Sequence, residues 1–390
     1  MLGDDVELDL AGPALNGIGL GAQPVAGRGA DGFLNEHAPI AHLRRLRDSH
    51  DADGVSRDLW RSFGEMGFSG VLIPEDQGGS GLGAVEAGVV AEALGRTLTP
   101  SPFLSSGVLS ATALKAGSGE QQAAWLPRIA AGEAMVSLAV DEAGKHAPHR
   151  IRTTAERSGN GFKLNGNKGF VLDGHVADAL IVADRTSGEG MDGLTLFLID
   201  PKAAGLEVER TVMVDAHNAA RVALTDVEVT ADAVLGPVDG GGEILERVLN
   251  LGRACAASSL LGAGDQAFRL TAEYLKTRKQ FGKLIGEFQA LQHRAAHVFT
   301  ELEIVRAATL AALQKLDAGE EDAAFAVSVA KAKAGRVAEL CVQEAVQMHG
   351  GVGMTDEFDV GLFMKRVRVL NELMGDHGFH AERVARAGGY

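Results

Sequence analysis

Cysteine is scarce in this chain, and its scarcity excludes two kinds of site. Only two of the 390 residues are cysteines, Cys255 and Cys341, and their spacing matches neither a CxxC motif nor a Cys/His metal-binding pattern. This spacing argues against a disulfide framework and against a zinc centre, and no metal site is predicted. We expect a reducing, cytoplasmic setting.

Long apolar runs and an excess of positive charge are also missing. No stretch reaches the roughly 18 uncharged apolar residues that a membrane span requires, and the first ten residues carry acids but no base, unlike a signal peptide. The 37 basic side chains are outnumbered by 52 acidic ones, which gives a formal net charge of −15. A nucleic-acid binder normally has the opposite balance. We therefore expect no binding to nucleic acid or to membranes.

What is present is the composition of an ordinary globular protein, 46% hydrophobic and 23% charged. Gly, Ala and Pro dominate residues 1–30, which we predict to be a flexible lead-in. Apolar residues then recur at three- and four-residue spacing, which predicts an N-terminal α-helical domain over 31–135, interrupted by a Pro- and Gly-rich loop at 73–81.

The hydrophobic pattern changes twice more along the chain. Short β-prone runs separated by turn signals predict a middle β barrel or sandwich over 136–240. A helical period then returns in four long segments, which predicts a C-terminal four-helix bundle over 241–390. The predicted fold class is therefore α+β with three domains. The expected strands are 136–140, 151–155, 162–164, 170–172, 179–183, 194–199, 206–208, 221–224 and 227–229, and the expected bundle helices are 243–276, 288–317, 322–348 and 358–373.

Two clusters in the last domain contain residue types that suit a phosphorylated, planar ligand. The run 278–289 combines a guanidinium that can pair with a phosphate, aromatic rings that can stack on a base, and glutamine amides. The run 347–351, Gln-Met-His-Gly-Gly, ends a helix with glycines that let a ligand approach backbone N–H groups. Taken singly, the first run is equally compatible with a solvated basic loop, and the second with an ordinary glycine helix stop.

In their order and in the domain plan around them, these clusters resemble the acyl-CoA dehydrogenase family over residues 33–390. The resemblance implies FAD as cofactor, an acyl-CoA substrate, electron-transfer flavoprotein as the electron acceptor and a tetramer. It also implies that the first cluster reaches across a subunit interface, with Arg278 at the FAD pyrophosphate. The residues of the two clusters that the resemblance assigns to FAD are Arg278, Gln280, Phe281, Ile285, Phe288, Gln289, Gln347, Gly350 and Gly351.

The resemblance is weaker in the middle domain. Where the family has a Thr-Glu-Pro-Gly-Ala-Gly-Ser stretch facing flavin and substrate, residues 141–147 read Asp-Glu-Ala-Gly-Lys-His-Ala. Where the family usually has Trp-Ile-Thr, this chain has Phe170-Val171-Leu172, and Leu172 cannot hydrogen-bond flavin N5 through its side chain. The resemblance places Val140, Asp141, Phe170 and Leu172 at the flavin. An ionised Asp141 there would disfavour the anionic reduced flavin, unless its side chain points to solvent.

The catalytic base of the family is missing. The family's reaction needs a carboxylate that takes the α-proton while the β-hydrogen leaves as hydride. The resemblance places Met374 at one of the family's two glutamate positions and Gly252, just before Arg253, at the other. The nearest acid is Asp376, which is either an alternative catalytic residue or a loop cap. Arg253 and Met374, the latter through its backbone N–H, are implied to bind the substrate.

The segment from Gly353 to Arg383 resembles the small subunit of pimeloyl-CoA dehydrogenase and subunits of heteromeric enzymes that shorten steroid side chains. The leading hypothesis is an FAD-dependent acyl-CoA dehydrogenase subunit in a hetero-tetramer, with the base on another polypeptide. Three alternatives stay open. The chain could be a self-sufficient, homo-tetrameric dehydrogenase using Asp376, a non-catalytic flavin- or acyl-CoA-binding protein, or a flavin monooxygenase on the same fold.

Overall fold

The structure is a computed structural model that describes residues 23–390. The predicted lead-in, 1–30, ends too late, because α1 (Gln23–His37) begins inside it; residues 1–22 lie outside the described residues. The predicted α+β plan is confirmed, with helices first, a sheet next and a helical bundle last. We keep 31–135, 136–240 and 241–390 as proposed domain limits.

Two of the N-terminal helices begin at side-chain caps. The Ser56 hydroxyl accepts a hydrogen bond from Leu59 N, and Ser118 forms a capping box with Gln121. The predicted loop at 73–81 is confirmed and contains one short 3₁₀ turn, Glu75–Gln77. The further elements of this region are α2 (Ile40–Asp48), α3 (Arg57–Glu65), α4 (Ala84–Thr97), the π-helix η2 (Phe103–Ser110), α5 (Ala111–Leu114) and α6 (Gly119–Ala130).

The middle region is one eight-stranded sheet that forks at β4. The strand order is β6-β7-β3-β2-β4-β5-β8, and β1 pairs with β4 in parallel beside that path. Alternating residues of the strands build a separate core, in which Phe162 and Phe197 meet edge to face at 5.2 Å. The strands are β1 (Val136–Ala139), β2 (Thr154–Ser158), β3 (Gly161–Leu172), β4 (Ala179–Arg185), β5 (Leu194–Ile199), β6 (Leu206–Val212), β7 (Asn218–Thr230) and β8 (Val234–Leu235).

Two long strands replace four short ones of the prediction. The expected strands 162–164 and 170–172 are halves of β3, and 221–224 and 227–229 are halves of β7. The break expected between strands 162–164 and 170–172 is absent, because the chain stays in the sheet and shifts its register against β7 there instead. A second shift lies between Lys168 and Val171. Such irregularities bend a strand and re-aim single side chains without ending the pairing.

The C-terminal bundle has the four predicted long helices and a fifth that the sequence reading missed. The fifth helix, α11, begins after Asp376, whose carboxylate accepts a hydrogen bond from Phe379 N. The bundle helices are α7 (Gly241–Thr277), α8 (Gln289–Ala318), α9 (Ala323–His349), α10 (Val360–Glu372) and α11 (His377–Ala387).

Glycines allow helix α4 of the N-terminal region to pack closely against helix α7 of the bundle. A Cβ at Gly95 of α4 would collide with the backbone of Ser259, and one at Gly262 of α7 would collide with the backbone of Glu92. The two helices therefore pack closely enough for each backbone to touch the other.

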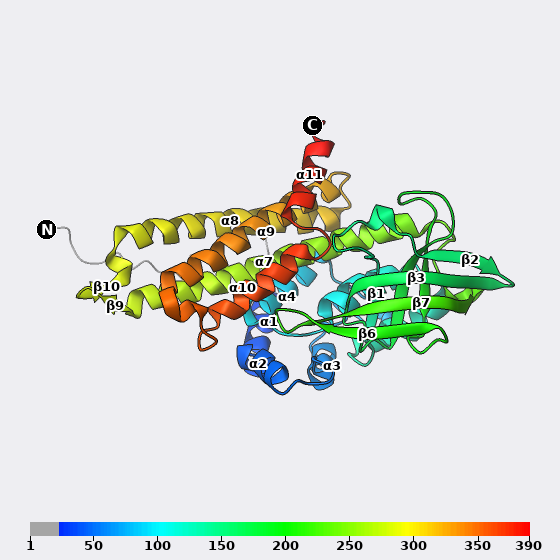
Figure 1. Cartoon of the computed structure of the whole chain (residues 1–390), viewed down its shortest axis with the longest axis horizontal. Helices are drawn as coiled ribbons and strands as arrows, with labels where there is room; N and C mark the ends of the chain where they lie inside the picture. The colour runs from blue at the N-terminus through cyan, green and yellow to red at the C-terminus, as the bar shows by residue number, and fades with distance from the viewer. Residues whose placement is uncertain (1–22) are drawn as a thin grey trace.

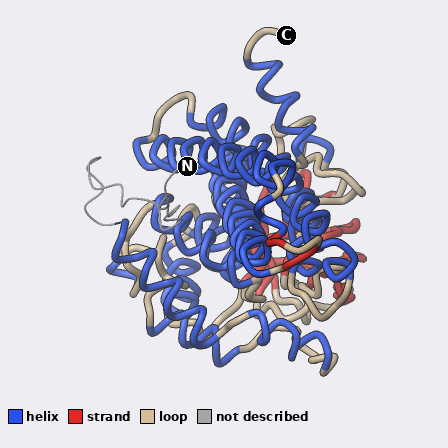
Figure 2. The backbone as a smooth tube through the Cα atoms, turned by 90° about the vertical axis from the view of Figure 1, so that its left-hand side faces the viewer, coloured by secondary structure: helices blue, strands red, loops and turns tan. Residues whose placement is uncertain are grey.

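Helix α7 joins the two ends of the molecule. It begins beside the middle sheet and ends at a two-stranded hairpin, β9 (Lys279–Gln280) and β10 (Lys283–Leu284), at the opposite end of the bundle (Figure 1). A helix of 37 residues spans about 55 Å. Seen from the hairpin end, the bundle lies in front of most of the sheet (Figure 2). Among residues 23–390, no helix is long and apolar enough to cross a lipid bilayer.

Candidate flavin and acyl-CoA sites

The first predicted FAD segment forms an exposed hairpin. Lys283 pairs with Gln280, so Phe281 and Gly282 form a two-residue turn, and both have positive φ, +54° and +81°. A positive φ is unfavourable for a bulky residue, and the Phe281 side chain lies 92% exposed at the tip. Its ring meets Phe288 edge to face at 6.2 Å. A large aromatic side chain held in this way suits a ligand or partner that covers it.

The second predicted segment lies against the first. Ile285 and Met348 share one small apolar cluster, which also contains Leu275. At Gly350 and Gly351 an added Cβ would meet nothing within 4 Å, so the backbone there is open. The structure therefore brings the two segments together at the end of the bundle.

Three cations at this end have no carboxylate partner among the described residues, although Lys283 Nζ lies 4.2 Å from the ring centre of Phe288. Within residues 23–390, Arg278, Lys279 and Lys283 form no ion pair with a carboxylate, although the chain carries a formal net charge of −15. Gln289 is exposed, and the Gln280 side chain bonds only to a backbone carbonyl next to it. Unpaired cations, an exposed aromatic ring and open glycines together form a donor set that fits a dinucleotide such as FAD.

His349, next to the open glycines, has a structural role. Its ring stacks on Tyr274 at 4.4 Å, and its Nδ1 donates to the carbonyl of Ala345 at 2.8 Å. Burial lowers the pKa of His349, which favours the neutral ring.

The middle-domain residues predicted at the flavin gather where β1 ends beside β3. Gly169 N donates to the carbonyl of Asp141 at 2.7 Å, which joins the two segments. Phe170 has φ +56° within the second register shift of β3, and its side chain is 38% exposed. Leu172 is partly buried and Val140 is buried. The Asp141 carboxylate does not point freely to solvent, because His146 Nδ1 lies 2.7 Å from it.

These two groups of predicted FAD residues are far apart within one chain. Arg253 lies beside the Asp141 group, since its guanidinium reaches His146. From Arg253 to Arg278 is 278 − 253 = 25 residues, nearly all in α7, or about 37 Å. The hairpin and the sheet accordingly stand at opposite ends in Figure 1. Within one chain, the residues predicted for FAD therefore form two separate groups rather than one closed site.

The two positions where the family's glutamate was expected face each other. A Cβ added at Gly252 would lie 2.6 Å from Met374 Sδ and would also collide with Leu109 of η2. Met374 is only 6% exposed and has φ +55°. The Met374 thioether therefore occupies the space beside Gly252. Neither residue has a side-chain group that could accept a proton, so neither can serve as the base that was expected at these positions.

Arg253 is wholly buried, which leaves no surface for direct contact with a substrate. Its Nε donates to the carbonyl of Met374 at 3.2 Å, and its Nη1 donates to Asn250 Oδ1 at 2.9 Å and reaches Glu246 at 3.4 Å. Burial lowers the pKa of Arg253 to about 10, so the guanidinium stays charged at neutral pH. We therefore assign Arg253 to holding the loop around Met374, in place of the predicted contact with the substrate.

Asp376 is engaged in structural contacts. Its carboxylate caps α11 and also accepts a hydrogen bond from Lys145 Nζ at 2.8 Å. These bonds lower its pKa to about 2, with Lys145 the larger cause. A carboxylate held in this way is a weak proton acceptor at neutral pH. The contacts favour the cap role over the catalytic role that the sequence left open.

The sequence reading missed a buried lysine beneath the same loop. Lys331 of α9 is fully buried, and its Nζ donates to the carbonyls of Leu370, Asn371 and Gly375 at 3.0–3.2 Å. Burial lowers the pKa of Lys331 to about 7. Its place in an Ala-rich helix distinguishes it from no other lysine in the sequence, so no local pattern could have revealed it.

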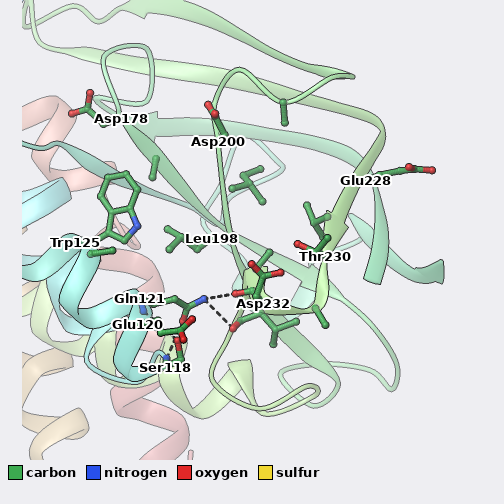
Figure 3. Close-up of a pocket in the computed structure, with 18 of the residues that line it drawn as sticks. Ser118, Glu120, Gln121, Trp125, Asp178, Leu198, Asp200, Glu228, Thr230 and Asp232 are labelled. Carbon is green, nitrogen blue, oxygen red and sulfur yellow. Dashed lines mark hydrogen bonds between the residues drawn. The ribbon is translucent and has the colours of Figure 1, made fainter. Parts of the chain in front are cut away.

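A groove lies elsewhere, between α6 and the ends of strands β5 and β7 (Figure 3). Its volume is about 1230 Å³, and Trp125, Leu198 and several acidic side chains line it. Gln121 bridges its wall by donating to the carbonyls of Asp232 and Val234. None of the residues predicted for FAD, substrate or catalysis lines this groove.

Known proteins resemble this chain in sequence and fold along most of its length. Three family models match it, described as the N-terminal, middle and C-terminal domains of acyl-CoA dehydrogenase, over residues 29–133, 139–227 and 239–389. Acyl-CoA dehydrogenase FadE12 of Mycobacterium tuberculosis is 32% identical over 325 residues, covering 80% of this chain and 82% of the relative. The long-chain specific mitochondrial acyl-CoA dehydrogenase of Sus scrofa is 30% identical, covering 86% and 80%.

Two solved structures are similar over nearly their whole length. The Tcur3481-Tcur3483 steroid ACAD variant has a TM-score of 0.84 at 29% identity, covering 94% of this chain and 98% of that chain. The ChsE4-ChsE5 complex from Mycobacterium tuberculosis has a TM-score of 0.85 at 26% identity, covering 95% and 97%. With the three domain matches, these similarities establish that the chain belongs to the acyl-CoA dehydrogenase family.

Proposed function

We propose that this FAD-dependent acyl-CoA dehydrogenase chain works as one subunit of a heteromeric enzyme and that a second polypeptide supplies the catalytic carboxylate. The observation that carries the proposal is the packing of Met374 Sδ against Gly252, at the two positions where a base was expected. A chain that keeps the residues proposed for nucleotide binding but has no carboxylate at either position is what such a division of labour requires.

The nucleotide-binding part of the proposal concerns the hairpin end. Arg278 would pair with the pyrophosphate, and Phe281, Gln280 and Gln289 would line the adenosine part. The remaining residues proposed for this half-site are Ile285, Phe288, Gln347, Gly350 and Gly351. Because Arg253, which lies beside the Asp141 group, is about 37 Å along α7 from Arg278, a complete site would combine the hairpin of one chain with the sheet of another.

In the substrate half of the site, backbone groups of this chain would act. When bound, FAD supplies the acceptor for the β-hydrogen as hydride. Among the described residues, Met374 N has no hydrogen-bond partner, so it is free to donate to a thioester oxygen on which negative charge develops. Arg253, His380 and Lys331 hold the backbone that carries this N–H.

Both solved relatives described above are named as pairs of proteins, and one is named as a steroid enzyme. These names support a two-polypeptide assembly, and they make a steroid-derived acyl-CoA the first substrate class to test. A hetero-tetramer with electron-transfer flavoprotein as acceptor is the corresponding proposal for partners.

Assay of the purified full chain with and without a partner tests the proposal. Alone, it should bind octanoyl-CoA, measured by calorimetry, but should not reduce ferrocenium. Adding a family member that carries glutamate at either position should produce turnover. Robust turnover by the lone chain would refute the division of labour, and no turnover with any such partner would favour a non-catalytic binding protein.

A further inference from the structure

His146 is buried in the seam between the middle sheet and the bundle, although its position corresponds to a glycine in the family stretch. Its side chain is 2% exposed. It contacts Asp141 through Nδ1 at 2.7 Å and Arg253 through Nε2 at 3.2 Å. Phe379 of α11 covers the ring edge to face at 5.3 Å. The imidazole therefore connects elements of two domains at one point.

These neighbours determine which ring nitrogen carries the proton. A guanidinium can only donate hydrogen bonds, so His146 Nε2 must accept the bond from Arg253. Nδ1 then carries the hydrogen and donates it to the Asp141 carboxylate. Asp141 thus orients the imidazole ring, as a carboxylate does in hydrolase triads, and the ring in turn orients Arg253 through Nε2.

The loop that presents His146 is itself anchored. Glu142 accepts hydrogen bonds from Arg152 N at 2.7 Å and Thr153 N at 3.0 Å, and from Lys168 Nζ at 2.7 Å. Lys168 is buried within the sheet. His146 is therefore held from the sheet side, and Arg253 is the group that it orients.

Each arm of the Arg253 guanidinium has a separate partner. Nε holds the carbonyl of Met374, and Nη1 holds Asn250 and Glu246. Among the described residues, His146 is the hydrogen-bond partner of Nη2. Losing it would leave a buried, charged donor without its acceptor, and the guanidinium would turn away from Met374 to recover one.

We propose that the Asp141–His146 pair is a positioning device of this chain, which orients Arg253 and thereby the Met374–Gly375 peptide group, whose carbonyl Arg253 Nε holds at 3.2 Å. Fixing this peptide group also restrains the Cα of Met374, and with it the N–H of Met374 on the preceding peptide group. The proposal rests on the proposed function, because the Met374 N–H is the donor assigned there to the thioester oxygen. His146 touches no reacting atom, so it is a positioning residue.

Three substitutions in the FAD-loaded full chain test this. His146→Leu fills the space but offers no acceptor, His146→Gln restores an acceptor and a donor, and the exposed His149→Gln is the matched control. His146→Leu should weaken octanoyl-CoA binding about tenfold. It should also speed amide hydrogen exchange over residues 373–376 without loss of FAD. His146→Gln should recover most of both, and His149→Gln should change neither.

The outcomes separate this proposal from the function on which it rests. If wild-type protein does not bind octanoyl-CoA, both fall. If wild-type protein binds but His146→Leu leaves affinity and exchange unchanged, the positioning role is wrong while the proposed function stands. Should His146→Leu fail to fold, His146→Gly, the residue of the family stretch, replaces it with the same expected effects.

Discussion

The hairpin end and the region around Met374 differ in whether their charged and aromatic side chains have partners within the chain. At the hairpin, three cations lack carboxylate partners, Phe281 is 92% exposed and two glycines face open space. Around Met374, Arg253 is fully buried with partners on each arm, and Met374 fills the space beside Gly252. The first region leaves its charged and aromatic groups open to a molecule from outside the chain, whereas the side chains of the second mostly satisfy one another.

This difference supports the proposal that the two tasks of the family have separated in this chain. A surface that keeps costly exposed groups suits binding to something large and anionic. A thioether at the position of a carboxylate cannot accept a proton, but it contributes apolar packing. Under the proposed function, the hairpin surface serves the nucleotide while Met374 serves packing.

Restoring the base should have the largest effect. Met374→Glu places a carboxylate where the family has one, and it should raise octanoyl-CoA turnover by the lone chain at least about 100-fold over wild type. Ferrocenium reduction is the measurement. Met374→Gln has the same shape without a basic carboxylate and should stay inactive, as should Met354→Glu at an exposed methionine. An inactive Met374→Glu protein that still binds FAD and octanoyl-CoA would show that more than the base is missing.

Weakening the hairpin should have the next largest effect. Arg278→Ala removes a cation without an internal partner, and it should weaken FAD binding about 10- to 100-fold because charge-assisted bonds to phosphate are strong. Titration of apoprotein with FAD, followed by flavin fluorescence, gives the affinity. Lys276→Ala is the control, since Lys276 is paired with Glu273 at 3.0 Å and lies two residues away. Equal affinities for the two variants would contradict the nucleotide role of the hairpin.

The contrast between the two regions also marks what the sequence could predict. The helix–sheet–helix order and four of the bundle helices followed from local periodicity. The union of short runs into the long strands β3 and β7 could not be predicted in this way. The register shifts of β3 at 165–170 look like turn signals when its partner strand β7 is unknown. Helix α11 was missed because its cap, Asp376, was considered only as a catalytic or loop residue.

The candidate site divides in the same way. The run 278–289 could be singled out from the sequence because its residue types alone suit a phosphorylated, planar ligand. The structure around Met374 depends on contacts between distant segments, namely Arg253 with His146 and Lys331 with Gly375. Such contacts leave no pattern in one sequence, since each residue alone resembles an ordinary packing or surface residue.

Removing the charge of Asp376 should have the smallest effect. Asp376→Asn keeps an N-cap side chain but loses the ion pair with Lys145, whose side chain is 67% exposed, so it should lower the free energy of unfolding by less than about 1 kcal/mol. Because folding depresses the pKa of Asp376 to about 2, the wild-type advantage should be present above about pH 4 and disappear as the pH falls toward 2. Denaturant titrations at several pH values measure it.

The same variant decides between cap and base. In the assembled enzyme, Asp376→Asn should turn over like wild type, and so should Asp322→Asn, a matched control in which an acid before α9 is paired with Lys315 at 2.8 Å. A fall of about 100-fold in Asp376→Asn alone is what a lost general base produces. That result would make the chain self-sufficient. Asp376 would then be the catalytic base, and Lys145 and the first turn of α11 would hold it until a substrate displaces them.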